Sequence, residues 1–425
     1  MENQDNESTM ADRKVEKEEE KIEVEESKPV MESPSDREWS EYENAYRQVM
    51  IGTLSVNTLV HLSRNEYIKY FQKDPGFDYV ETSLLHVAVG CHDETFYNFL
   101  ISNGADVTIE TEHFGPVLFN AIMMRNSKLV EALLSAGADA NKRSELWIND
   151  RMYAYTPLEL AAKKNLADIV KILIDKGAEV NGYNNLNNVT PLYLAAQHSS
   201  TDVIEVLVEA GADVDLVAKI EGTAKMETAL SVVIKRGRNL KAVKAMLKNL
   251  RININYADDL GFSFLHYAVL LSHNKEMVSC LLDAGINVDL RDGDGELPIE
   301  YDDDDNKSYK ICIPVIKEHI VKLIAADFHV CEENMMAIQG HEFDDLRVRC
   351  YEEIDAMRRR RLYGTDLNCY RVLHLSRHVS SAILKHGDLD FTYDDELRAR
   401  FPLYSGMIIY HLDRARRQAM TRYNP

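Results

Sequence analysis

The chain has 425 residues, of which 45% are hydrophobic and 28% charged, so it is long enough for two or three domains with a sizeable core. Its formal net charge is −21, and no apolar run approaches the roughly 18 residues that a membrane span needs. The start of the chain is charged where a signal peptide needs an apolar centre, and its six cysteines contain no Cys-x-x-Cys pair. These features predict a cytoplasmic protein with no membrane partner.

The first 38 residues are dominated by acidic side chains. They hold 14 acidic and 6 basic residues and few large apolar ones, a composition that buries too little surface to fold. We therefore predict that residues 1–38 form a disordered acidic tail. The following stretch, residues 39–79, shows apolar periodicity, which predicts a helical amino-terminal cap with Asp74-Pro75-Gly76 as its turn.

A short pattern recurs seven times between Ser83 and Ile299. The most complete copy is Thr190-Pro191-Leu192-Tyr193-Leu194-Ala195-Ala196. Successive copies start 33 to 40 residues apart, and the other six begin at Ser83, Pro116, Thr156, Thr228, Ser263 and Leu297. A period in this range predicts a solenoid of stacked units. We place these repeats at residues 80–305, with the truncated seventh copy as the closing cap.

Each copy has the pattern of a pair of helices. Ser or Thr can cap the first helix, and Pro157 or Pro191 occupies the first helical position, where no amide hydrogen is needed. About 20 residues later, an apolar helix ends in a residue that favours the left-handed conformation; these are Gly104, Gly137, Gly177, Gly211 and Gly285. The fifth copy has Asn249-Leu250 there instead.

These motifs resemble the ankyrin-repeat family, whose signature is Thr-Pro-Leu-His-x-Ala followed by Gly-Ala-Asp. Glu159 and Tyr193 stand where the signature has His. The resemblance implies an all-α ankyrin-repeat solenoid of about six to seven repeats with an amino-terminal cap. It also implies a non-catalytic adaptor that binds a protein partner through the concave face and the finger turns.

Two fingers, residues 141–155 and 215–227, are unusually long and carry apolar residues. Such residues either fold back over the first helices of their own repeats or form an exposed anchor, since Trp and Tyr are common binding hot spots. The candidate anchors on these and neighbouring fingers are Trp147, Tyr153, Tyr155, Tyr183, Tyr193, Ile220, Tyr256 and Phe262, with Trp147 first among them.

The sequence contains no motif that predicts catalysis, a cofactor, a metal site or a small-molecule substrate. His374 and His378 are one helical turn apart, but the acid of a His-Glu-x-x-His site is absent. The four carboxylates Asp302 to Asp305 are typical of a solvated loop between domains. The acidic repeats argue against nucleic acid, because phosphate backbones are bound mainly by Lys and Arg, and they favour a basic protein partner.

Residues 306–425 leave the repeat period but keep apolar stripes at helical spacing, which predicts a small helical carboxyl-terminal domain. Arg358 to Arg361 form a basic run that is typical either of a charged helix end or of a nuclear import signal. A nuclear location therefore stays open beside the cytoplasmic one.

Three segments of this domain, 330–334, 350–357 and 401–408, resemble the PRANC tails of insect and poxvirus ankyrin proteins. The resemblance implies an F-box-like module that docks a Skp-type adaptor and so recruits a cullin ubiquitin ligase. The F-box-like candidates are Phe401, Pro402, Leu403, Tyr404, Ile408 and Leu412. The Glu of the F-box opening, Leu-Pro-x-Glu-Ile, is missing here.

A second hypothesis is a regulator of signalling similar to the I-kappa-B-type ankyrin proteins. Such a protein masks a basic segment of a transcription factor, which the acidic array favours. Salt distinguishes the two hypotheses, because a charge-masking complex weakens between low and physiological salt, whereas an apolar anchor at Trp147 does not.

Overall fold

The computed structural model describes residues 41–63, 79–111, 115–148, 151–182, 188–219, 225–301, 307–362, 367–374 and 393–423. Several sequence predictions fall outside these residues: the tail of residues 1–38, the turn Asp74-Pro75-Gly76, the run Asp302 to Asp305, Tyr183, Ile220 and His378.

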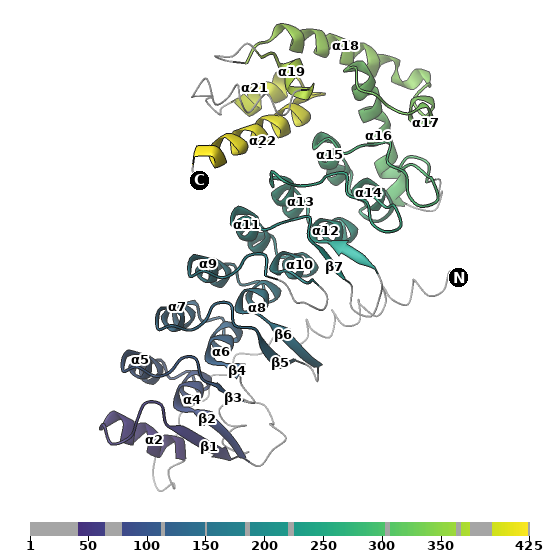
Figure 1. The fold of residues 1–425 in the computed structure, drawn as a ribbon. Helices are drawn as coiled ribbons and strands as arrows, with labels where there is room; N and C mark the ends of the chain where they lie inside the picture. Colours follow the sequence, from purple (N-terminus) through teal and green to yellow (C-terminus); the bar gives the residue numbers. More distant parts are fainter. Residues whose placement is uncertain are drawn as a thin grey trace.

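The centre of the molecule is a stack of helix pairs (Figure 1). The first helices of the pairs lie together on the side that we call the first-helix face: α4 (Leu84–Gly90), α6 (Val117–Met123), α8 (Pro157–Lys163), α10 (Pro191–Gln197), α12 (Ala229–Arg236) and α14 (Phe264–Leu271). The second helices lie on the opposite side: α5 (Glu94–Ser102), α7 (Ser127–Ser135), α9 (Ala167–Asp175), α11 (Thr201–Glu209), α13 (Leu240–Leu247) and α15 (Lys275–Asp283).

The first helices begin as the sequence predicts. In five of them, a Ser or Thr side chain before the helix accepts a hydrogen bond from the third helical amide; the caps are Ser83, Thr156, Thr190, Thr228 and Ser263. Each such cap contributes about 1 kcal/mol. The sixth first helix, α6, follows Pro116 and lacks a side-chain cap.

The second helices end in a repeated left-handed residue. The five glycines predicted there have φ values between 81° and 103°, a conformation that costs a residue with a Cβ roughly 1 to 2 kcal/mol. The amide after each glycine then bonds a carbonyl five residues back, as from Ala105 to Leu100 at 2.9 Å.

A further helix, α16 (Lys307–Ala325), ends with the same geometry. Asp327 has a φ of 62°, and the amide of Phe328 bonds the carbonyl of Leu323 at 2.9 Å. This helix packs against α14 and α15. The stack therefore continues past the truncated seventh copy, and α16 takes the place of that copy's second helix.

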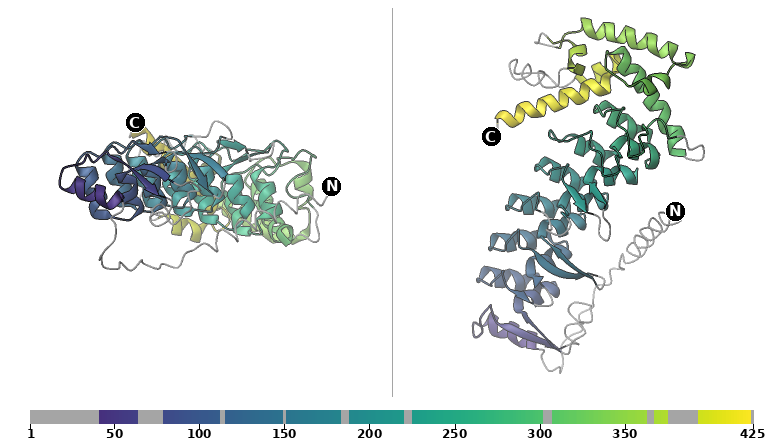
Figure 2. Two further views of the ribbon diagram at one scale, coloured as in Figure 1. Left: turned by 90° about the horizontal axis from the view of Figure 1, so that it is seen from below. Right: turned by 45° about the vertical axis from the view of Figure 1, so that its right-hand side comes forward.

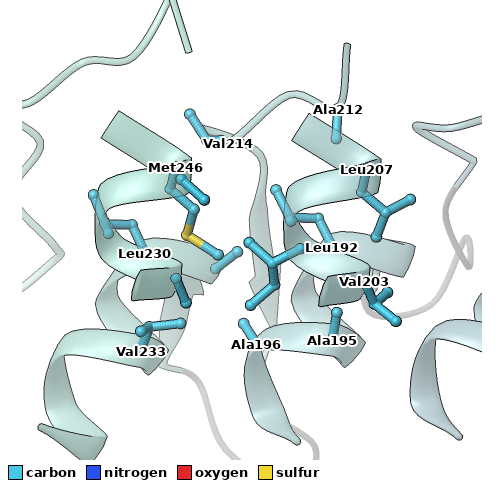
Figure 3. Packing of buried hydrophobic residues seen from close by; sticks show 14 of the residues in the cluster. Leu192, Ala195, Ala196, Val203, Leu207, Ala212, Val214, Leu230, Val233 and Met246 are labelled. Carbon is cyan, nitrogen blue, oxygen red and sulfur yellow. The ribbon is translucent and has the colours of Figure 1, made fainter. Parts of the chain in front are cut away.

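Neighbouring units share one continuous core. Leu192 and Ala195 of α10 are at most 1% exposed, as is Leu158 of α8. In Figure 3, Leu192 and Ala196 of α10 lie beside Leu230 and Met246 of the next unit. Burying a Leu side chain contributes roughly 2 kcal/mol, and the alanines leave room for the helices to approach.

Four antiparallel hairpins project from the side of the first helices (Figure 1). They pair β1 (Leu59–Ser63) with β2 (Tyr79–Ser83), β3 (Glu110–Thr111) with β4 (Gly115–Pro116), β5 (Ser144–Ile148) with β6 (Arg151–Tyr155), and β7 (Val217–Lys219) with β8 (Met226–Thr228). The two long fingers contain the last two hairpins.

The amino-terminal cap differs from the helical prediction for residues 39–79. Its helix α2 (Glu41–Met50) packs against α4, but the strand β1 follows. Val60 and Leu62 of β1 are buried while Leu59 and His61 are exposed. This alternation is the period of a strand, and it is too short to stand out beside the longer helical pattern.

Beyond α16, the chain forms α17 (Glu332–Met336), a 3-10 turn η2 (His341–Phe343), α18 (Asp344–Arg359), α19 (Cys369–His374), α21 (Tyr393–Arg400) and α22 (Ser405–Tyr423). The last of these, α22, turns back and packs against α15 (Figure 2). Within the described ranges, no helix is both long and apolar enough to span a membrane.

The same helix compensates for the glycine that the fifth copy lacks. Arg414 and Arg417 of α22 donate hydrogen bonds to the carbonyls of Leu250 and Lys248, at 2.8 and 2.9 Å. These carbonyls follow the end of α13, where carbonyl groups have no partner within the helix and where positive charge is favourable.

Candidate interaction surface

Two of the predicted anchors are core residues. The hydroxyl of Tyr155 accepts a hydrogen bond from Lys163 at 2.8 Å, and the ring is buried. Tyr193 is 3% exposed, and its hydroxyl donates to Glu227 at 3.3 Å. Burial raises the pKa of Tyr193, so the phenol remains a donor. These two residues stabilise the stack from inside, which differs from the surface role predicted for them.

The first of the two long fingers, residues 141–155, places Trp147 and Tyr153 on the two strands of one hairpin. Trp147 of β5 pairs with Met152 of β6, and Tyr153 pairs with Leu146. The hairpin lies beside the first helices (Figure 1). Tyr183 and Ile220, on other fingers, lie outside the described residues.

Tyr256 and Phe262 belong to an aromatic cluster where the last two fingers meet α14. Both are half-buried. The ring of Phe262 stacks on Tyr267, with centroids 5.5 Å apart, and on Tyr301, with centroids 6.4 Å apart. Tyr256 contacts Phe264 at 5.8 Å. The cluster joins two successive units.

Two tyrosines of this cluster, Tyr267 and Tyr301, are held by the same arrangement of hydrogen bonds. Tyr267 donates its hydroxyl to Asp258, and Tyr301 donates to Asp292, in each case across nine residues of sequence. The other carboxylate oxygen of each Asp accepts two finger amides, at 2.9 and 3.0 Å for Asp258 and at 3.0 Å for both bonds of Asp292. Each finger therefore has a fixed shape and a fixed carboxylate.

The charge states follow from these contacts. Burial and the bond to Asp258 raise the pKa of Tyr267, and burial and the bond to Asp292 raise that of Tyr301. Burial alone would raise the pKa of Asp292, but the bonds from Tyr301 and from the amides of Glu296 and Asp294 lower it. At neutral pH the tyrosines are thus neutral donors, and Asp292 is a carboxylate.

A lysine extends this cluster to the neighbouring unit. The ammonium of Lys235 on α12 lies 4.0 Å from the ring centroid of Tyr267 and 2.5 Å from a carboxylate oxygen of Glu227. Glu227 in turn receives the bond from Tyr193. A row of contacts thus runs from Tyr193 on α10 through Glu227 on β8 and Lys235 on α12 to Tyr267 on α14.

Sequence reasoning identified Tyr256 and Phe262 but missed their partners. Asp258 and Asp292 lie 34 residues apart, as do Tyr267 and Tyr301, so each pair occupies one repeat position. That recurrence could have identified the two Asp and Tyr pairs from the sequence. It was hidden because the second pair falls in the truncated copy.

The predicted F-box-like residues mostly lie inside the carboxyl-terminal unit. Four of them are buried: Phe401, Tyr404, Ile408 and Leu412. Pro402 is exposed and Leu403 half-buried. The buried carboxylate of Glu353 on α18 accepts bonds from the amides of Leu403 and Tyr404, at 2.9 to 3.2 Å, and so fixes the start of α22.

In the part of the chain that the structure describes, no group of three or more His, Cys, Asp or Glu side chains could hold a metal ion. His374 stacks on Phe328, with ring centroids 4.4 Å apart. All six cysteines are free thiols.

A family model described as "Ankyrin repeats (3 copies)" matches this chain twice, at residues 118–218 and 216–292. Ankyrin repeat and SOCS box protein 5 of rabbit is 35% identical over 99 residues, which are 23% of this chain and 28% of that protein. The human protein of the same name is 37% identical over 84 residues, 20% of this chain and 23% of that protein. A putative ankyrin repeat protein of fowlpox virus is 41% identical over 71 residues, 17% of this chain and 15% of that protein. The matches therefore span less than a third of these relatives' length.

Two solved structures are similar in fold. The ankyrin repeat domain of Bcl-3, described as a member of the IkappaB protein family, is 21% identical and covers 55% of this chain and 97% of its own, with a TM-score of 0.42. The human ASB11 ankyrin repeat domain is also 21% identical and covers 55% and 98%, with a TM-score of 0.43. The repeats of this chain are ankyrin repeats, a protein-binding fold.

Proposed function

Because this chain is built on an ankyrin-repeat solenoid, we propose that it is a non-catalytic, cytoplasmic adaptor that binds a protein partner through its first-helix face and fingers. The observation that carries the proposal is the aromatic and carboxylate cluster around Phe262. Rings held by stacking and by hydrogen bonds lose little freedom on binding, and Tyr is a common hot-spot residue.

The test is affinity purification of partners with the full chain and with a surface variant. Leu260, at the tip of the finger that precedes α14, is 56% exposed, and Tyr256 beside it is half-buried. We expect the double change Leu260→Ser and Tyr256→Ser to lose most of a partner that the unchanged chain recovers. Met50→Ser is the matched control, since Met50 is 43% exposed on α2 at the far end of the stack. A partner retained equally by all three chains would contradict the proposed surface.

A more specific version adds recruitment of a ubiquitin ligase. Residues 306–425 would dock a Skp-type adaptor and bring a cullin ligase to the protein held by the repeats. Two observations support it: a second helical unit follows the repeats, and relatives named after a SOCS box also combine repeats with a further module.

Burial decides how this version is tested. Replacing Ile408 would disrupt the core of the carboxyl-terminal unit, so loss of binding would say nothing about a surface. The accessible candidates are Pro402 and Leu403. We expect the full chain to capture a purified Skp-type adaptor and the double change Pro402→Asp and Leu403→Asp to abolish capture. Failure of the unchanged chain to bind the adaptor would remove this version.

The I-kappa-B-like alternative is favoured by one observation, the acidity of the repeats. It requires a partner complex whose affinity falls several-fold between low and physiological salt, because screening weakens attraction between exposed charges. A complex insensitive to salt would contradict it.

A further inference from the structure

We propose that the sixth and seventh fingers form a receptor for a Lys or Arg side chain in an extended segment of the protein partner. We call this area the finger receptor; it consists of residues 256–262 and 289–301 together with Tyr267. The inference rests on the proposed protein-binding function and specifies the chemistry of what is bound.

The two fingers form a single rigid surface. The amide of Gly293 in the seventh finger bonds the carbonyl of Leu260 in the sixth at 2.7 Å. Gly261 has a φ of 80°, and a Cβ added to it would lie 2.7 Å from the backbone of Asp292 and Gly293. The fingers are therefore in direct backbone contact, which a side chain at Gly261 would prevent.

Aromatic rings line this surface in a stack. The plane of Phe262 is tilted by only 24° from Tyr267 and by 23° from Tyr301. Tyrosine faces attract cations, and this cluster already holds one: Lys235 lies 4.0 Å from the centroid of Tyr267. Because Lys235 already occupies Tyr267 and Phe262 stacks on both tyrosines, the ring left for an ammonium or guanidinium group of a partner is Tyr301, which is half-buried at the end of the stack.

The charge of the surface has the matching sign. Residues 256–262 and 289–301 contain seven carboxylates and one arginine. That arginine, Arg291, is directed to Glu333 at 2.8 Å and to Glu300 at 3.8 Å. Asp259 and Asp294 are exposed, and neither takes part in an ion pair found among the described residues.

These features favour one kind of occupant. Phosphate backbones are repelled by such a surface, whereas a basic side chain gains both the carboxylates and the rings. Leu260 is exposed at the tip of the sixth finger, so an apolar residue beside the Lys or Arg has a contact as well. The shape is a row over two repeats, which suits an extended segment.

In the experiment, the full chain is used to select binding peptides from a phage library of random short peptides. The affinity of each selected peptide is then measured by fluorescence anisotropy. The test variant is Asp259→Asn with Asp294→Asn, which removes two exposed charges without touching the core. The matched control is Glu131→Gln with Asp202→Asn, two exposed acids on the second helices. A second variant, Leu260→Ser, removes the apolar contact without a change of charge.

We expect the selected peptides to be enriched in Lys and Arg and to bind the Asp259 and Asp294 variant about tenfold more weakly than the control, which corresponds to about 1.4 kcal/mol. We expect Leu260→Ser to weaken the same peptides. Peptides without basic residues, or with equal affinity for variant and control, would overturn the finger receptor and leave the proposed function standing. A selection that yields no binding peptide also overturns it, and if the affinity purification recovers no partner either, the proposed function fails with it.

Discussion

At the residue scale, different side chains occupy the position of the signature His, and each is hydrogen-bonded to a finger. His86 and His266 each donate from Nε2 to a backbone carbonyl in the next finger, at 3.0 and 3.2 Å. Tyr193 instead reaches the carboxylate of Glu227 in the next finger. The sequence identified this position and its substitutions, but it could not identify the partners, which lie about 30 residues away in the following unit.

The buried histidine predicts a pH dependence of stability. Burial lowers the pKa of His86 from 6.5 to about 4. Between these values the unfolded chain binds a proton that the folded chain does not, so the free energy of unfolding falls as the pH falls. We expect His86→Gln to reduce this pH dependence by up to one proton, or about 1.4 kcal/mol per pH unit. The Gln amide can replace the bonds of His86 to Ser83 and to the carbonyl of Gly115.

The measurement is urea denaturation between pH 4.5 and 7. The control is His329→Gln, because that histidine is exposed and its replacement removes no buried group. Equal slopes for the unchanged chain and His86→Gln would contradict the assignment of His86 as a neutral, buried bridge.

Glu159 stands at the same position, but its charged side chain bonds the finger of its own unit. Its carboxylate accepts two bonds from Arg143, at 2.7 and 2.8 Å, and one from the amide of Thr156 at 3.0 Å. Burial raises its pKa in spite of these bonds. We expect Arg143→Ala to reduce the free energy of unfolding by about 3 kcal/mol, because it leaves a buried carboxylate without its cation.

A second change provides the control. Histidine occupies the position of Glu159 in two other units and needs no arginine there. The double change Arg143→Ala and Glu159→His should therefore recover at least half of the loss in thermal or chemical denaturation. A double variant no more stable than Arg143→Ala would show that the loss does not come from the unpaired charge.

At the scale of elements, helix starts and ends were predictable because each depends on residues close in sequence. The caps at Ser and Thr and the glycines after the second helices are local signals. The exception is the end of α13, whose carbonyls are bonded by Arg414 and Arg417 from a helix more than 160 residues away. No pattern within the fifth copy could reveal that contact.

This contact predicts a coupled loss of protection. Replacing both Arg414 and Arg417 with Ala removes two charge-assisted bonds, which should cost about 2 kcal/mol in total. We expect faster hydrogen exchange at the end of α13 and along α22, with little change in α5 or α7. Arg349→Ala, on the exposed side of α18, is the matched control. Unchanged exchange in α13 would show that the two arginines do not stabilise this helix.

At the scale of the whole molecule, the sequence predicted an array followed by a separate helical domain. The array follows from the repeated motif, and the match to ankyrin repeats over residues 118–292 confirms the type of repeat. The junction between the array and the carboxyl-terminal helices could not be predicted from the repeated motif. The helix α16 belongs to the stack by its packing on α14 and α15, although its sequence lacks the signature.

Residues 306–425 therefore close the array, and their removal should have a local effect. Each unit of a solenoid contacts only its neighbours, so a chain ending at Asp305 should expose the faces of α14 and α15 that α16 covers, while the first units keep theirs. We expect hydrogen exchange in α14 and α15 to quicken at least tenfold in that chain, and exchange in α4 to α9 to change little. A chain ending at Gly340 retains α16 and α17 and should restore most of the protection. Equal protection of α14 in both truncated chains would mean that α16 is not part of the stack and that the carboxyl-terminal unit is a separate domain.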